Sequence, residues 1–209
     1  MPEVREHRKP GRPPLSSLSV PTPDRILEAA AKLFSEFGYD GVSMEQVADD
    51  CDVTKAVVYY HFQSKANLFT MTMIRLMETI RQRTLEILTR EDSLYERLLL
   101  IAKIRLRIDT PLDFINIMRG GLTGITEEQI QSMREAEERL FQTLAQSFET
   151  SIATGEIRKV DPVLAARVYM ALLMVGMNEH NPASGEQPDS DKRAEQLLEM
   201  MWVGVGLQK

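Results

Sequence analysis

The chain has 209 residues, a hydrophobic fraction of 43% and a formal net charge of −6 at pH 7, as expected for a globular protein with one sizeable core or two small ones. Its longest apolar stretch, residues 168–177, is too short to supply the roughly 20 residues that span a bilayer, so we expect no membrane segment. The single cysteine, Cys51, excludes an intramolecular disulfide, and the N-terminus lacks an apolar signal sequence, so we expect a cytoplasmic protein.

Residues 1–21 form a basic arm that is rich in proline and serine and therefore cannot hold a helix or a strand. Its segment Lys9–Pro14 resembles an AT-hook core, in which Arg12 would enter the narrow minor groove of DNA. The alternative is a disordered tail that binds nothing. The acidic net charge argues against a broad positive surface, so any DNA contact must rest on a few cations and this arm.

Helical patterning begins at Thr22-Pro23-Asp24, which is typical of a helix start. Apolar residues then recur at helical spacing until Gly38, where we expect the first helix to end. Ser43 and Gln46 fit a capping box, which predicts a second, short helix that runs to Cys51. Cys51 falls on the apolar face of that helix, which favours a buried side chain over a nucleophile.

Thr54 is expected to cap a third helix, VTKAVVYYHF, and Ser64 to open a long one from Lys65 to about Thr89. The turn before the third helix contains Asp52, which can adopt the left-handed backbone conformation. Two helices joined by a short turn and preceded by a supporting helix make a helix-turn-helix unit, which we place at residues 22–69.

The third helix should bury one face and leave aromatic rings on the other. With about 100° per residue, Val58 and Phe62 share the core side, while Tyr60 points away from it. An exposed tyrosine on so short a helix suggests that this face docks against something, and the major groove of B-DNA accepts a helix. The alternative is that both tyrosines pack against neighbouring helices and the outer face is merely solvated.

Each side chain from Thr54 onward can then be given a role on DNA. Lys55 can donate to guanine O6 and N7, Ala56 permits close approach, and Val57 can contact a thymine methyl. Hydroxyl, imidazole and ammonium groups are suitable phosphate donors, and this helix and its flank supply them at Tyr59, Tyr60, His61 and Lys65.

Residues 25–69, RILEAAAKLFSEFGYDGVSMEQVADDCDVTKAVVYYHFQSKANLF, resemble the DNA-binding domain of the tetracycline-repressor (TetR) family of bacterial transcription regulators. The resemblance rests on elements spread in order over the whole segment: Ala30-Leu33-Phe34, Gly38, Ser43, Val47-Ala48, Val53-Thr54-Lys55, Tyr59-Tyr60-His61-Phe62 and Ser64-Lys65. It implies a homodimer that places its third helices in successive major grooves, with Ser43 among the phosphate contacts. It also implies a helical C-terminal domain whose small ligand releases the DNA. The family commonly has glycine where Asp52 stands.

Beyond residue 70 the chain again reads as helices and turns. We expect helices over 94–108 and 111–118, from the capping box of Thr126 and Gln129 to near Gly155, from Pro162 onward, and over 191–207. No strand alternation or hairpin signal is present, so the predicted fold class is all-α. Residues 70–209 form the predicted effector-binding and dimerisation domain.

Ten of the twelve methionines lie at residue 71 or beyond, which fits either ordinary core packing or an adaptable apolar pocket. As ligand-binding residues for a hydrophobic or amphipathic effector we predict Met71, Met77, Ile104, Ile108, Phe114, Met118, Met170 and Met174. The helix over 163–177 is apolar nearly all round, so we predict a homodimer through the last two helices. The last helix would contribute Leu197, Leu198, Met201, Trp202 and Val205.

The sequence contains no HExxH, GxSxG, P-loop or paired-cysteine motif, and its three histidines are far apart. We therefore expect no enzyme activity, no metal and no cofactor. The predicted function is a repressor that leaves its double-stranded DNA operator when an apolar effector binds. The alternative is an architectural DNA-binding protein without an effector.

Overall fold

A computed structural model describes residues 22–107, 124–178 and 189–205, and the regular structure in these ranges is helical throughout. The fold class is therefore all-α, as predicted. The described helices are α1 Thr22–Gly41, α2 Met44–Asp50, α3 Lys55–Phe62, α4 Lys65–Leu88, α5 Leu94–Leu106, α7 Glu127–Ala153, α8 Pro162–Asn178 and α9 Ser190–Val205.

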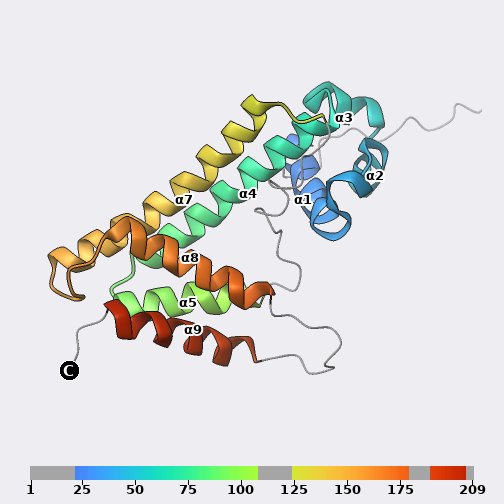
Figure 1. The fold of residues 1–209 in the computed structure, drawn as a ribbon. Coiled ribbons are helices and arrows are strands. Elements are labelled where there is room, and N and C mark those ends of the chain that lie inside the picture. Colours follow the sequence, from blue (N-terminus) through green and yellow to red (C-terminus); the bar gives the residue numbers. More distant parts are fainter. Residues whose placement is uncertain (1–21, 108–123, 179–188, 206–209) are drawn as a thin grey trace, which may run out of the picture.

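The helices form two groups joined by the long pair α4 and α7 (Figure 1). The three short helices α1 to α3 gather at one end, and α4 continues directly from α3 toward the other end. There α5, α8 and α9 pack against one another, and α7 runs alongside α4 for most of its length. None of the described helices is both long and apolar enough to cross a membrane.

Two of the predicted helix caps form as expected, one lacks its side-chain hydrogen bond, and one further cap was not predicted. Ser43 with Gln46, and Thr126 with Gln129, form the predicted reciprocal capping boxes at the starts of α2 and α7. Thr54 occupies the N-cap position of α3, but its side chain makes no capping hydrogen bond, so that part of the prediction is wrong. A third capping box, which the sequence reading missed, joins Ser93 and Glu96 at the start of α5.

The first helical run ends at Gly38, as predicted, and a short further helical turn follows it within α1. Gly38 adopts φ 69° and ψ 176°, a conformation that is costly for any residue with a Cβ atom, and helical structure resumes as far as Gly41. This turn brings the buried ring of Tyr39 against two others, with centroids 6.2 Å from Phe34 and 4.9 Å from Phe69. These aromatic contacts fix α1 against the start of α4.

Two hydrophobic clusters make up the described core. The first joins α1, α2 and α3 to the N-terminal half of α4, and it also includes Met133 and Ala136 of α7. The second joins the far end of α4 to α5, α7, α8 and α9. Since α4 and α7 contribute to both clusters, a shift of either helix at one end is carried mechanically toward the other.

The predicted short helix over 111–118 and the predicted loop before α9 lie outside the described residues, as does the arm over 1–21.

Candidate nucleic-acid interface

The turn between α2 and α3 depends on a residue in the left-handed region. Asp52 has φ 53°, which confirms that this aspartate adopts the left-handed conformation, as the sequence predicted. The turn closes through the hydrogen bond from Val53 N–H to the Ala48 carbonyl, at 3.0 Å. It is tied to α1 because Arg25 Nη2 donates to the Cys51 carbonyl at 2.8 Å. Cys51 itself is buried, and burial raises the pKa of its thiol, which keeps it protonated.

The two faces of α3 are separated as the helical spacing predicted. Val58 and Phe62 are fully buried, with 0% and 1% of their surface exposed. Tyr60 is 78% exposed and Tyr59 is 43% exposed, so neither ring belongs to the core. The core side of α3 is thus held rigidly, while two aromatic side chains with hydroxyl groups stand on its outer side.

The remaining predicted contacts on α3 differ in how freely they can reach a partner. Thr54 and Ala56 are exposed, whereas Val57 is half-buried and packs against the first hydrophobic cluster. His61 is also half-buried, and its ring lies edge-on to Tyr60 with the centroids 5.1 Å apart. The outer surface of α3 is therefore built around Ala56 and Tyr60.

Lys55 at the start of α3 is paired in the free protein. Its ammonium lies 3.2 Å from Glu45 Oε2 in the first turn of α2, and both side chains are largely exposed. A base contact by Lys55 would have to compete with this carboxylate.

Two predicted phosphate contacts flank α3. Ser43 Oγ accepts the N–H of Gln46 and keeps its own O–H available for donation. Lys65 donates to the Asp40 carbonyl at 3.2 Å and lies over the Tyr39 ring, 4.5 Å from the centroid. The sequence did not predict this engagement, because Asp40 lies in the short helical turn that follows Gly38. Arg12 lies outside the described residues.

The predicted ligand residues are not gathered into one site. Met77 is buried in the first hydrophobic cluster, whereas Met170 packs against the second. Met71 and Ile104 are exposed, and Met174 is half-buried on α8. Ile108, Phe114 and Met118 lie outside the described residues, so the ligand site as a whole stays a prediction. Within the described ranges, no three metal-ligating side chains lie together.

Comparisons with known proteins match both halves of the chain. Residues 26–71 match the model of the family described as "Bacterial regulatory proteins, tetR family". The chain is 27% identical over 177 residues to the HTH-type transcriptional regulator YhgD of Bacillus subtilis (strain 168), a match that covers 81% of this chain and 91% of YhgD.

Two solved structures share the fold over most of the chain. One is AibR in complex with isovaleryl coenzyme A and operator DNA, with a TM-score of 0.65, 24% identity and coverage of 86% of this chain and 97% of AibR. The other is the transcriptional regulator FadR from Bacillus subtilis in complex with stearoyl-CoA, with a TM-score of 0.68, 18% identity and coverage of 85% and 96%.

The family model spans the same helix-turn-helix residues on which the sequence resemblance rests, from α1 through the start of α4. The remaining helices have the arrangement of these solved regulators. The chain is therefore similar to TetR-family bacterial regulators in the sequence of its helix-turn-helix and in the fold of the helices that follow it.

Proposed function

We propose that the protein is a homodimeric repressor that binds a two-part operator through α3 and releases it when a small amphipathic molecule binds the C-terminal helices. The observation that carries the DNA-binding part is the outer face of α3, where Tyr60 is exposed opposite the buried Val58 and Tyr59 is exposed on the flank of the helix. Two exposed phenol rings on an eight-residue helix are unfavourable in water unless a partner covers them. In this proposal Tyr60 and Ser43 donate to phosphates, and Ala56 faces the base edges.

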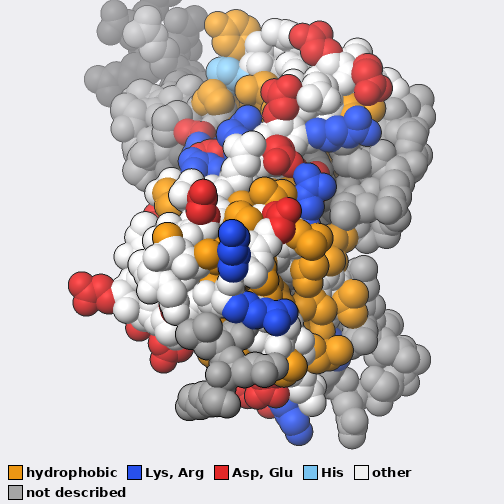
Figure 2. Space-filling model, turned by 60° about the vertical axis from the view of Figure 1, so that its left-hand side comes forward, with side chains coloured by type: hydrophobic (Ala, Val, Ile, Leu, Met, Phe, Trp, Pro, Cys, Tyr) orange, Lys and Arg blue, Asp and Glu red, His pale blue; other side chains and the backbone are white. Residues whose placement is uncertain are grey.

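A dimer surface is supported by two stripes of exposed side chains. On α8, Leu164, Val168, Ala171 and Val175 recur at steps of four, three and four residues, and all four are exposed. On α9, Met200 and Val203 are 72% and 77% exposed. Such spacing is typical of helices that pack in a bundle with a second copy. Hydrophobic side chains form a continuous group on the lower half of the molecule in Figure 2.

The residues first expected on the dimer side of α9 need correction. Leu198 and Met201 are buried in the chain's own second cluster, and Trp202 and Val205 pack against that cluster. The prediction took every apolar residue of α9 as part of one dimer face, whereas these residues face the chain's own core. The exposed apolar residues of α9 are Met200 and Val203, which stand next to Met201 and Trp202 in the sequence.

Ligand control is supported by the position of α4. Only two residues separate this helix from the end of α3, and its N-terminal half shares the first cluster with α1 to α3. A molecule that moves the far half of α4 would change the spacing of the two α3 helices in a dimer. Two relatives of the same fold contain acyl-CoA molecules, and one of them is also bound to operator DNA. A ligand can shift DNA affinity only by its differential affinity for the two arrangements.

Footprinting on DNA around the protein's own gene tests the DNA-binding part. We expect two protected half-sites about one helical turn, or a multiple of it, apart. Tyr60→Phe should weaken binding to every operator variant by a similar factor, because a phosphate contact carries no sequence information. Protection of one isolated half-site, or of none, would contradict the proposal.

The dimer surface has its own test. Val168→Glu should convert the dimer to monomer in sedimentation experiments and abolish cooperative protection of the two half-sites, because it places a charge in the middle of an apolar seam. Arg83→Glu, on the exposed face of α4, is the matched control and should leave the dimer intact. A Val168→Glu protein that stays dimeric would place the interface elsewhere.

A further inference from the structure

A cavity of about 550 Å³ lies between α4, α7 and the start of α5, at the end of α4 that is remote from the helix-turn-helix. Its volume falls in the range of small-molecule sites. Three arginines from three different helices line it: Arg81, Arg97 and Arg139. The other lining residues are leucine, threonine, glutamine and serine, and none is acidic. In a chain with a net charge of −6, this composition is selective for an anion. We call it the arginine cavity.

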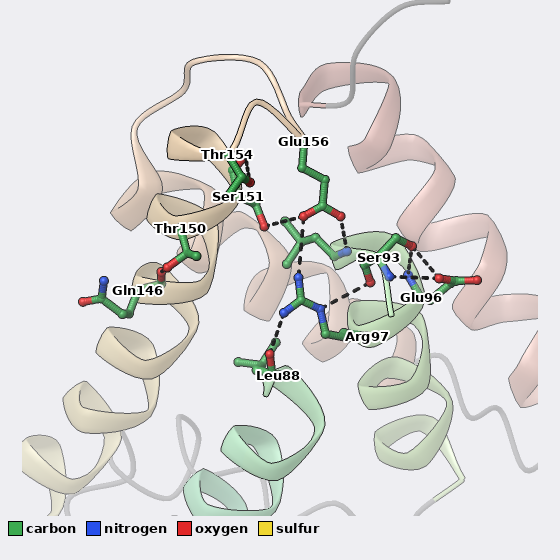
Figure 3. Close-up of polar contacts among 10 residues, drawn as sticks. Leu88, Ser93, Glu96, Arg97, Gln146, Thr150, Ser151, Thr154 and Glu156 are labelled. Carbon is green, nitrogen blue, oxygen red and sulfur yellow. Dashed lines mark hydrogen bonds and ion pairs between the residues drawn. The ribbon is translucent and has the colours of Figure 1, made fainter. Parts of the chain in front are cut away.

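Arg97 is held in place by the structure around it (Figure 3). Its Nη1 donates to the Leu88 carbonyl at 2.5 Å, and its Nη2 lies 3.6 Å from Glu156 Oε2. Gln146 and Thr150 of α7 lie across from it in the same view. Arg97 therefore forms a fixed wall with its charge balanced by Glu156.

The charges of the other two arginines are not balanced equally. Arg81 makes a bidentate pair with Glu78, at 2.6 and 3.0 Å. Arg139 is exposed, and its positive charge helps to lower the pKa of the same carboxylate, Glu78, that Arg81 binds. The three arginines of the cavity thus face two carboxylates, Glu78 and Glu156, neither of which lines it, so the balance leaves about one positive charge in excess.

A hydroxyl group in the wall also lacks a partner. Ser147 Oγ is buried and makes no hydrogen bond. The other hydroxyl groups of α7 that line the cavity have partners within the helix. Thr143 and Thr150 each donate to the carbonyl four residues earlier, both at 2.9 Å. A buried polar group without a partner destabilises the protein, and a ligand oxygen that accepts its O–H would remove that cost.

The cavity also has an apolar side. Leu85 and Leu88 of α4 line it one turn apart, and Leu85 is partly open to solvent. A ligand that filled the cavity would therefore meet leucine methyl groups on α4 and hydrogen-bond donors on α7.

We propose that the arginine cavity binds an amphipathic oxyanion, with its carboxylate or phosphate head at Arg139 and Ser147 and its short apolar tail against Leu85 and Leu88. This inference rests on the proposed function, since it names the chemical class of the effector. A molecule seated there lies directly between α4 and α7 and alters the packing of α4, whose other half holds α1 to α3.

Calorimetry on the full chain without DNA tests the site. The probes are octanoate and octyl phosphate, each kept below its micelle-forming concentration, and 1-octanol, kept below its solubility limit. The two anions should bind to the wild-type protein, and the neutral alcohol should bind at least about tenfold more weakly, a difference of about 1.4 kcal/mol. A preference between octanoate and octyl phosphate identifies the head group.

Two variants locate the head group. Arg139→Gln should weaken the preferred anion about tenfold while leaving 1-octanol unchanged. Arg134→Gln, on the same helix and outside the cavity, removes an exposed pair with Glu127 and should leave both affinities unchanged. Ser147→Ala should raise the melting temperature of the free protein, because it removes an unpaired hydroxyl, and reduce the further rise caused by the anion.

Three results would overturn the proposal: no anion binding to the wild-type protein, equal binding of octanol, or equal effects of Arg139→Gln and Arg134→Gln. The operator footprint is measured separately. A protein that protects two half-sites but binds no anion keeps the proposed function and loses this site. A protein that binds the anions at Arg139 but protects no DNA keeps this site and contradicts the proposed function.

Discussion

Glu156, in the turn after α7, lies 3.6 Å from Arg97 of α5, and the pair closes a junction between three helices (Figure 3). The same carboxylate accepts the N–H of Leu94 at the start of α5 and, at 2.8 Å, the hydroxyl of the buried Ser151 on α7. Arg97 in turn donates to the last residue of α4, Leu88. One glutamate thus joins the ends of α4, α5 and α7.

Replacing this carboxylate should destabilise the C-terminal domain. Glu156→Ala leaves an arginine, a buried hydroxyl and a helix N–H unpaired together, and we expect it to lower the free energy of unfolding by about 2–4 kcal/mol. Glu156→Gln retains an acceptor and should cost less. Urea unfolding followed by circular dichroism measures both variants.

Asp92 provides the control for this experiment. Its pair with Arg90 at 3.7 Å lies in the neighbouring turn, but both side chains are about half exposed. Asp92→Ala should change the free energy of unfolding by less than about 0.5 kcal/mol. If the two alanine variants were equally unstable, the junction would have no special role.

The pairing of Lys55 with Glu45 predicts an unusual gain of function. Glu45→Gln frees Lys55 and removes a negative charge from the surface that we propose to face DNA. We expect operator affinity to rise about two- to fivefold, with a larger salt slope, because one more protein cation then displaces counterions from the DNA phosphates. Gel-shift titrations over a range of salt concentrations measure both quantities.

Glu91→Gln is the matched control for Glu45→Gln, since it removes one exposed carboxylate at the opposite end of α4. It should leave operator affinity unchanged apart from a small net-charge effect. Equal gains from both substitutions would show that net charge, and not the release of Lys55, is responsible.

Local patterns were enough to predict the helix-turn-helix from the sequence. Caps such as Ser43 with Gln46 act within one turn, and the exposure of Tyr60 follows from its angle to Val58 and Phe62. Gly38 interrupts the first helix as predicted, but the helical turn that follows it was not predicted. That turn carries Tyr39, which packs on Phe69, a contact between residues far apart in the chain.

The arginine cavity could not be predicted in the same way. Arg81, Arg97 and Arg139 stand on three helices with no common spacing, and each reads in isolation as a solvated charge. Only the packing of α4 on α7 brings them together, and only the absence of a partner for Ser147 marks the wall as incomplete. The predicted dimer face of α9 was wrong for a related reason, because apolar residues stand on more than one face of this helix and the sequence does not show which of them the chain's own core buries.

The basic arm predicts a loss of affinity that depends on salt. Deleting residues 1–20 should weaken operator binding several-fold and reduce the salt slope, since the segment carries four basic side chains and two acidic ones. Arg12→Ala should reproduce most of this loss when the flanking DNA is rich in A and T, and Arg5→Ala should not. Unchanged affinity and salt slope after the deletion would show that the arm takes no part in binding.

Glu137 on α7 gives the protein a component of stability that depends on pH. Burial raises the pKa of its carboxyl group, the neighbouring Glu138 adds to the rise, and Arg134 opposes it. The folded state therefore holds this proton more tightly than the unfolded state does. For an acid with a raised pKa, stability is greatest when both states are protonated and falls as the pH rises through the two pKa values.

Glu137→Gln should remove this dependence, because the amide stays neutral at every pH. Below the ordinary glutamate pKa of about 4.3 the variant and the wild-type protein should be equally stable, and the variant should become the more stable one as the pH rises toward neutrality. Melting temperatures of both proteins, measured at intervals between about pH 4 and pH 8, follow the difference in stability between them. Within this range the other carboxylates keep the protein folded. Glu149→Gln, an exposed position on the same helix, should show no such widening. A gap that is constant over this range would mean that the carboxylate of Glu137 is as well solvated in the folded protein as in the unfolded chain.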